Sequence, residues 1–234
     1  MKLKKKNMLK TTLTALMISA IGTTTITAAT GTIYSYKTTD RILSIKNGDS
    51  IQNDNNNDVS LLTLTQGMCV NPKNNTTFFI RVNTDNTAAG IFKFKEGSKK
   101  ITAVKANCSY LGHGNDMAFK SDNAKTESGL YIATKYDSAD IKADSKKSSV
   151  VCIKTDGSLG HRYDVRLTPN SDPIPIGGIT YDPDSNLFII RKNESRQYYI
   201  GYFSNTRESL ENTHGSFVIT GSFQINLCIS RHLL

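Results

Sequence analysis

The sequence predicts an all-β protein of repeated antiparallel units, because three stretches of the chain have the same order of turns and strands. Each unit opens with a small or polar turn that leads at once into an apolar strand, and a second polar turn leads into the next strand. The openings lie at residues 66–70, 112–119 and 177–182, and the second strands at residues 77–82, 129–134 and 186–192. No stretch has sustained helical periodicity, so strands are expected to make up the fold.

Each unit also contains sequence for a third and a fourth strand. These strands are predicted at residues 89–94 and 100–104, at residues 149–154 and 162–167, and at residues 197–203 and 216–219. The equivalent positions Met68, Met117 and Ile179 are 49 and 62 residues apart. Propeller blades repeat about every 40–50 residues, and an insertion around residues 136–148 accounts for the longer second unit. We therefore predict a partial β-propeller of about three four-stranded blades.

The physical reason for this architecture is burial. A four-stranded twisted sheet cannot bury both of its faces alone, so blades pack radially against their neighbours. Innermost strands crowd around a central channel, which favours small or polar residues where they begin, and Gly67, Asp116 and Gly178 hold this position in the three units. A β-sandwich is the main alternative, but a sandwich does not predict the same order of turns and strands three times.

Two stretches carry a resemblance to known proteins. They are residues 111–119 (LGHGNDMAF) with 130–134 (LYIAT), and residues 177–188 (GGITYDPDSNLF). Both resemble blades of secreted bacterial β-propellers of the NHL, YncE-like or quinoprotein-dehydrogenase-like superfamily. The resemblance covers about residues 61–203 and implies blade structure, and no catalytic pattern comes with it.

The start of the chain has the three-part pattern of a secretory signal peptide. Five lysines lie in the first ten residues, residues 11–26 carry no charge, and residues 27–29 are small enough for cleavage. We expect a secreted or cell-surface bacterial protein that begins near Ala29 or Thr30, with no transmembrane segment in the mature chain. An amphipathic anchor or an uncleaved signal anchor is the alternative.

The expected domain organisation follows from the leader and the repeats. It consists of the signal peptide at residues 1–29, lead-in strands and an Asn/Asp-rich loop at residues 30–60, and the propeller at residues 61–234. The blades are expected at about residues 61–105, 111–168 and 176–220, and the tail at residues 221–234 starts a further blade. Because closed propellers have four to eight blades, we expect a truncated product or assembly with other copies. Open blade edges favour self-association.

The charge of the mature chain is modest. The net charge of +9 includes five leader lysines, which leaves +4 after cleavage. The other basic residues are scattered, and we interpret those around Lys93 and Lys95 as solvated turn residues. Nucleic acid is therefore not an expected partner.

The four cysteines are Cys69, Cys108, Cys152 and Cys228. In an exported chain they permit two disulfides with three pairings. Cys69 and Cys152 lie in apolar strand sequence, which favours the alternative of small buried side chains. No two cysteines are close enough for a zinc motif, and we predict neither a metal site nor a cofactor.

His113, Asn115 and Asp116 are the candidate site residues, because they lie where the second innermost strand begins at the channel mouth. His113 and Asp116 could bind a ligand or carry out acid–base chemistry with partners from other blades. The structural alternative is that Asn115 and Asp116 hydrogen-bond turn amides while His113 lies on the rim.

Residues 182–186 (DPDSN) lack the glycine and distant glutamate of a calcium-binding EF-hand loop. The sequence also lacks a G-x-S-x-G nucleophile elbow.

Two classes of function remain open, together with the possibility that the truncated chain has none of its own. The first is an exported binding or interaction module for a protein, a cell-wall polymer or a small ligand. The alternative is a propeller lyase or hydrolase that uses His113 and Asp116. The enzyme requires these two side chains and a further His or Glu to converge within hydrogen-bond reach.

Overall fold

The computed structural model describes residues 62, 64–96, 101–121, 127–144, 146–205 and 214–225, together with two short strands near the start of the chain. These are β1 (Thr11–Thr12) and β2 (Thr32–Ile33), which pair with each other in antiparallel orientation. The chain divides into two compact units, Met1–Ser44 and Ile45–Leu234. Apart from β1 and β2, the predicted leader, lead-in and Asn/Asp-rich loop lie outside the described residues.

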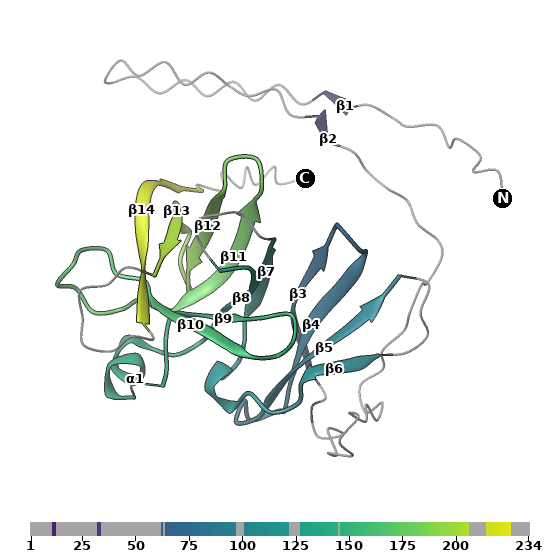
Figure 1. Ribbon diagram of the computed structural model, residues 1–234. Coiled ribbons are helices and arrows are strands. Elements are labelled where there is room, and N and C mark those ends of the chain that lie inside the picture. The colour runs from purple at the N-terminus through teal and green to yellow at the C-terminus, as the bar shows by residue number, and fades with distance from the viewer. Residues whose placement is uncertain are drawn as a thin grey trace, which may run out of the picture. The chain divides into compact units, whose positions relative to one another are not determined.

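The first four strands of the larger unit form one sheet, here named blade 1. Its strands are β3 (Leu64–Asn71), β4 (Thr76–Val82), β5 (Ala89–Lys95) and β6 (Thr102–Lys105). They follow one another in chain order, each antiparallel to the last (Figure 1). β-branched and aromatic residues fill the strands, and Asn-rich turns join β3 to β4 and β4 to β5, as hairpins require.

The remaining eight strands form two further meanders of the same kind. Blade 2 consists of β7 (Asp116–Lys120), β8 (Gly129–Ala133), β9 (Val150–Ile153) and β10 (Leu159–Asp164). Blade 3 consists of β11 (Ile176–Asp182), β12 (Leu187–Lys192), β13 (Gln197–Ser204) and β14 (His214–Gln224). The predicted all-β fold, a partial β-propeller of three four-stranded blades, is confirmed.

One feature of the topology goes beyond the repeated pattern. The start of β14 pairs in parallel with β10, with Arg162 opposite His214 and Asp164 opposite Ser216. This pairing joins the outermost strands of blades 2 and 3 into a single eight-stranded sheet (Figure 1).

In the described part of the chain, two short helices interrupt the strands. The 3₁₀-helix η1 (Ser109–Leu111) precedes β7, and α1 (Ser138–Ala143) lies in the insertion of blade 2. The Asp137 side chain caps α1 by accepting a hydrogen bond of 2.8 Å from the backbone N–H of Asp140. Because a helix of six residues carries little periodic signal, the sequence pattern does not predict α1.

The hydrophobic core consists mainly of two layers, one between each pair of successive blades. Strand β8 shows how one strand serves both layers, because its side chains alternate between the two faces of the sheet. Leu130 and Ile132 pack with residues of blade 1, whereas Tyr131 and Ala133 pack with residues of blade 3. Burial on both faces of blade 2 is what the propeller architecture requires.

The innermost strands β3, β7 and β11 lie beside one another. The approach is closest at Gly67 of β3, where a Cβ atom would overlap the backbone of Asp116 in β7. Gly178 of β11 has more room, since a Cβ atom there would lie 3.4 Å from its nearest neighbour, the Arg191 side chain. The sequence predicts small or polar residues where the innermost strands begin. The steric need for a small residue is strictest at Gly67.

Candidate functional site

Asp116 and Asn115 connect the innermost strands of blades 2 and 3. One carboxylate oxygen of Asp116 accepts a hydrogen bond from its neighbour Met117 N–H at 2.9 Å. The other accepts from the backbone N–H of Ile179 in β11 at 3.0 Å. The Asn115 side-chain amide donates to the carbonyl oxygen of Ile176, also in β11, at 3.2 Å. Both side chains thus satisfy backbone groups of the next blade.

The environment of Asp116 favours its neutral form. Burial raises the pKa of the carboxyl group above its ordinary value, although the hydrogen bonds from Ile179 and Met117 and the charge of Arg191 act in the opposite direction. Ionisation of Asp116 therefore costs folding free energy.

Replacing Asp116 with asparagine is expected to change how stability depends on pH. Because the folded pKa is raised, the carboxyl group contributes most below its unfolded pKa, and this contribution is lost as the pH rises through the folded pKa. Asparagine does not titrate. The melting temperature of the wild-type protein minus that of Asp116→Asn should therefore fall as the pH rises from about 3 to about 7. A difference in melting temperature that stays constant or grows over this pH range would contradict a raised pKa for Asp116.

His113 has different surroundings. Its ring Nδ1 is buried and has no hydrogen-bond partner among the described residues. Burial, followed by the charge of Lys135, lowers the pKa of His113, so the ring is neutral near pH 7. Within the described part of the chain, His113 and Asp116 form neither a hydrogen bond nor an ion pair with each other. The structure therefore does not bring the two side chains together as an acid–base pair, and a role for these residues in ligand binding stays a prediction.

A cleft of about 430 Å³ lies along the innermost strands. Its lining includes Asp116 and Cys69 together with apolar side chains such as Met68 and Phe119. Burial, followed by the nearby charge of Asp116, raises the pKa of the Cys69 thiol to about 12. The thiol is therefore protonated at neutral pH and is a poor nucleophile. Cys69, Cys108 and Cys152 are all free thiols, and Cys228 lies outside the described residues.

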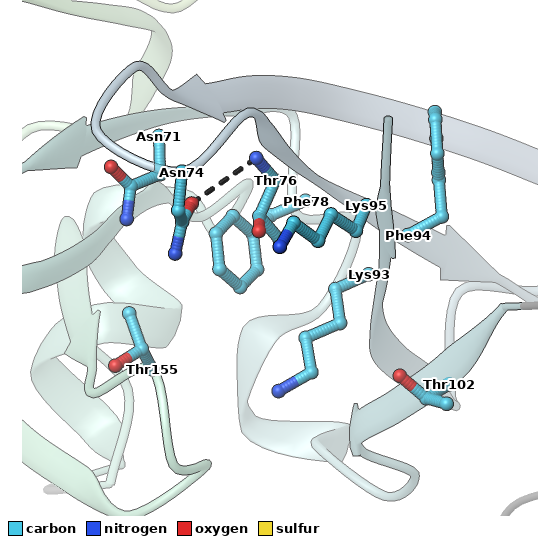
Figure 2. A pocket seen from close by; sticks show the side chains of 9 residues that line it. All are labelled: Asn71, Asn74, Thr76, Phe78, Lys93, Phe94, Lys95, Thr102 and Thr155. Carbon is cyan, nitrogen blue, oxygen red and sulfur yellow. Dashed lines mark hydrogen bonds between the residues drawn. The ribbon is translucent and has the colours of Figure 1, made fainter. Parts of the chain in front are cut away.

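A second cavity, of about 410 Å³, lies between blade 1 and a turn of blade 2, and we name it the lysine groove. It is lined by polar, basic and aromatic residues: Asn71, Asn74, Thr76, Phe78, Lys93, Phe94, Lys95, Thr102 and Thr155. Figure 2 shows the two lysine side chains extending from β5 into the space between the Asn74 turn and Thr155.

Strand register explains why these side chains gather. Directly opposed residues of neighbouring strands share one face of a sheet. Phe78 of β4 lies opposite Lys93 of β5, and Lys93 lies opposite Thr102 of β6. Thr76 and Lys95 form the next opposed pair on that face. The alternation of strand side chains thus places both lysines on the side of blade 1 that faces blade 2.

The floor and one wall of the groove are firmly held. The buried Phe78 ring stacks on Phe119 of β7, with ring centroids 6.1 Å apart and planes 6° apart. In the turn between β3 and β4, the Asn74 side chain accepts a hydrogen bond from the Thr76 N–H at 3.2 Å (Figure 2). Asn75 adopts a left-handed backbone conformation (φ 51°), and its side chain donates to Glu96 at 2.8 Å.

The opposite wall is the turn that carries Thr155 in blade 2. Lys105 of β6 donates from its ammonium group to the carbonyl oxygen of Gly157 at 3.2 Å. Gly157 has φ of 89°, and a Cβ atom there would overlap the carbonyl oxygen of Val104. Only glycine combines this conformation with so close an approach. Blade 1 therefore fixes the blade 2 turn at the side of the groove.

The described lining of the groove is basic. None of the described residues that line it is acidic, and neither Lys93 nor Lys95 forms an ion pair with another described residue. Two carboxylates adjoin lining residues in the sequence: Glu96, which accepts a hydrogen bond from Asn75, and Asp156, which accepts hydrogen bonds from Ser158. Lys93 and Lys95 lie on β5 and not in a turn, so that part of the sequence interpretation is wrong, whereas Lys95 is exposed to solvent as expected. The alternation in residues 91–95 (IFKFK) was the signal that could have placed them on one face.

Other chemistry is sparse in the described part of the chain. Among these residues no group of three or more His, Cys, Asp or Glu side chains could hold a metal ion. Likewise, no helix within the described ranges is long and apolar enough to cross a membrane.

Comparisons with known proteins give little further guidance. No protein-family model and no curated protein matches the sequence. Among solved structures, the chain is similar to a protein from Lactobacillus plantarum, with 15% sequence identity and a TM-score of 0.36. The match covers 72% of this chain and 45% of the Lactobacillus plantarum chain, so this chain spans less than half the length of that protein.

Proposed function

We propose that this protein is an exported β-propeller binding module that holds an acidic, hydroxyl-rich ligand in the lysine groove. A carbohydrate chain with carboxylate or phosphate groups has this chemistry. The observation that carries the proposal is the convergence of Lys93 and Lys95 on one face of blade 1, in a cavity whose described lining contains no acidic residue.

The groove offers each kind of contact that such a ligand needs. The two ammonium groups supply positive charge without fixed geometry, which suits carboxylate or phosphate groups. Asn71 and Asn74 add side-chain amides, and three threonines add hydroxyl groups that both donate and accept. The cavity volume of about 410 Å³ suits a small molecule or a short segment of polymer.

Electrostatics favour an acidic over a neutral ligand. Lys93 and Lys95 point into one cavity, and no described acidic side chain neutralises them there. Bringing an anion between the two ammonium groups relieves their mutual repulsion. Because the groove is open to solvent, added salt screens this attraction.

Titration calorimetry with trigalacturonate, an oligosaccharide with three carboxylates, tests the proposal. We expect binding to the wild-type protein, and about tenfold weaker binding to Lys93→Met and to Lys95→Met, equivalent to about 1.4 kcal/mol each. Raising the NaCl concentration from about 50 mM to about 300 mM should weaken wild-type binding further.

Two controls accompany this titration. Lys146→Met removes the same charge from an exposed residue in the insertion of blade 2, outside the groove, and should leave binding unchanged. Neutral galactotriose should bind much more weakly than trigalacturonate. Equal affinity for the two sugars, or equal loss in all three lysine variants, would refute a charge-selective groove.

The proposal includes export to a secreted or cell-surface location and a relationship to the NHL, YncE-like or quinoprotein-dehydrogenase-like propellers. The lysine-rich start, the uncharged segment and the small residues that follow support export. Expression in a bacterium with the native leader, followed by N-terminal sequencing, should give a mature chain that begins near Ala29 or Thr30. Retention of Met1 in the cell-associated protein would argue against cleavage.

A further inference from the structure

Lys105 reaches blade 2 because of an irregularity in β6. Phe92 of β5 lies opposite Ala103 of β6. The preceding residue of β5, Ile91, lies opposite Lys105, so Val104 is an extra residue in a β-bulge. Ile91 packs with residues of blade 2, and opposed residues share one face of a sheet. The bulge therefore turns Lys105 to the face of blade 1 that meets blade 2, whereas regular register would place it on the other face.

The bulge meets a second unusual feature, at Gly157 in the turn between β9 and β10. The Lys105 ammonium group donates to the Gly157 carbonyl oxygen at 3.2 Å. The carbonyl oxygen of the bulged Val104 lies where a Cβ atom of Gly157 would be, and Gly157 has a positive φ of 89°. A β-bulge, a left-handed glycine and a charge-assisted hydrogen bond thus coincide at one contact between the blades.

The turn transmits this contact to Thr155, two residues before Gly157. The Gly157 N–H donates to the Lys154 carbonyl oxygen at 2.8 Å, and the Lys154 N–H donates to that of Ser158 at 2.9 Å. The Asp156 carboxylate accepts from the Ser158 N–H at 2.8 Å and from its hydroxyl at 2.7 Å. Because these bonds hold the turn together internally, the place of the Gly157 carbonyl determines the place of Thr155.

We propose that Lys105 is a positioning residue of the lysine groove, which holds Thr155 where a ligand can contact it together with Lys93 and Lys95. This inference rests on the proposed function. Lys105 is not among the described residues that line the groove, whereas Lys93 and Lys95 extend from blade 1 into the space beside Thr155 (Figure 2). A ligand that contacts both walls binds more tightly when the walls are held in place before it arrives.

Two variants break the contact from opposite sides, and titration calorimetry of the full chain with trigalacturonate measures the effect. Lys105→Met removes the donor, and Gly157→Ala forces the turn away from Val104 without changing the charge. Each should weaken binding about fivefold, which corresponds to the loss of one hydrogen bond of ordinary strength. The double variant should bind about as weakly as the weaker single variant, since both substitutions break the same contact. The amide resonance of Thr155 should shift in both variants before any ligand is added.

The dependence of affinity on salt separates positioning from ligand contact. Between about 50 mM and about 300 mM NaCl, Lys105→Met and Gly157→Ala should lose affinity by the same factor as the wild type, because Lys93 and Lys95 are intact. Lys93→Met should show a smaller loss. Lys105→Arg keeps a donor for the carbonyl oxygen and should restore most of the affinity. Lys73→Met removes a charge from an exposed residue outside the groove lining and should change affinity by less than about twofold.

Three results would overturn the role of Lys105 while leaving the groove a binding site. They are wild-type affinity in Lys105→Met, a salt dependence of Lys105→Met as shallow as that of Lys93→Met, and losses that add in the double variant. The second result would mean that Lys105 contacts the ligand directly. A wild-type protein that does not bind trigalacturonate would instead refute the binding site itself, and with it the role of Lys105.

Discussion

Replacing Gly67 with alanine is expected to reduce the free energy of unfolding by roughly 1–3 kcal/mol, as overpacking does in other cores. The added Cβ atom would overlap the Asp116 backbone, which is held by its place in β7 and cannot rotate away as a side chain can. β3 and β7 would have to separate, and the layer between blades 1 and 2 would lose contacts. Urea unfolding followed by circular dichroism measures the change.

Gly178→Ala is the matched control for this substitution. Gly178 holds the equivalent position in blade 3, but the nearest neighbour of an added Cβ atom is the flexible side chain of Arg191 at 3.4 Å. This distance is ordinary van der Waals contact, so the substitution should change stability by no more than about 0.5 kcal/mol. If both variants lost the same free energy of unfolding, the close approach of β3 to β7 would not be the cause of the loss in Gly67→Ala.

Replacing Phe203 with alanine is expected to cost about 3–5 kcal/mol of folding free energy. The Phe203 ring is fully buried between blades 2 and 3. Its centroid lies 4.6 Å from that of Tyr163, 4.8 Å from that of Phe188 and 5.1 Å from that of Tyr131. Removing the ring leaves a cavity lined by other aromatic groups that cannot easily collapse to fill it.

The graded variant Phe203→Leu separates loss of volume from loss of the ring. Leucine keeps part of the buried volume, so its cost should be clearly smaller than that of alanine. Both values come from urea unfolding at one pH, with the slope of the transition checked for two-state behaviour. If Phe203→Ala cost less than about 1 kcal/mol, the aromatic cluster would not be the core that joins blades 2 and 3.

The strands can be predicted well because each strand carries its own local signal. The apolar runs around Phe79 and Ile190 end in Asn- or Asp-containing turns, and β4 and β12 lie there. The parallel pairing of β10 with β14 has no such signal, since it joins residues about fifty positions apart through backbone groups alone. The capped turn of α1 is too short to show a period.

The candidate site is harder to predict for a related reason. The sequence indicates Asp116 as an unusual residue at a strand start, but its hydrogen bond to Ile179 depends on how β7 and β11 approach each other. The lysine groove combines residues of β3 to β6 with Thr155 from the next blade. Register across three strands and the packing of two blades must both be known before Lys93 and Thr155 can be placed at one cavity.

Amide chemical shifts mapped during a titration with trigalacturonate are the sharpest test of the proposal that the lysine groove between blades 1 and 2 binds a ligand. The largest shifts are expected at Thr76, Lys93 and Lys95 of blade 1 together with Thr155 of blade 2. Shifts confined to the innermost strands around Asp116, or shifts that leave Thr155 unchanged, would contradict it.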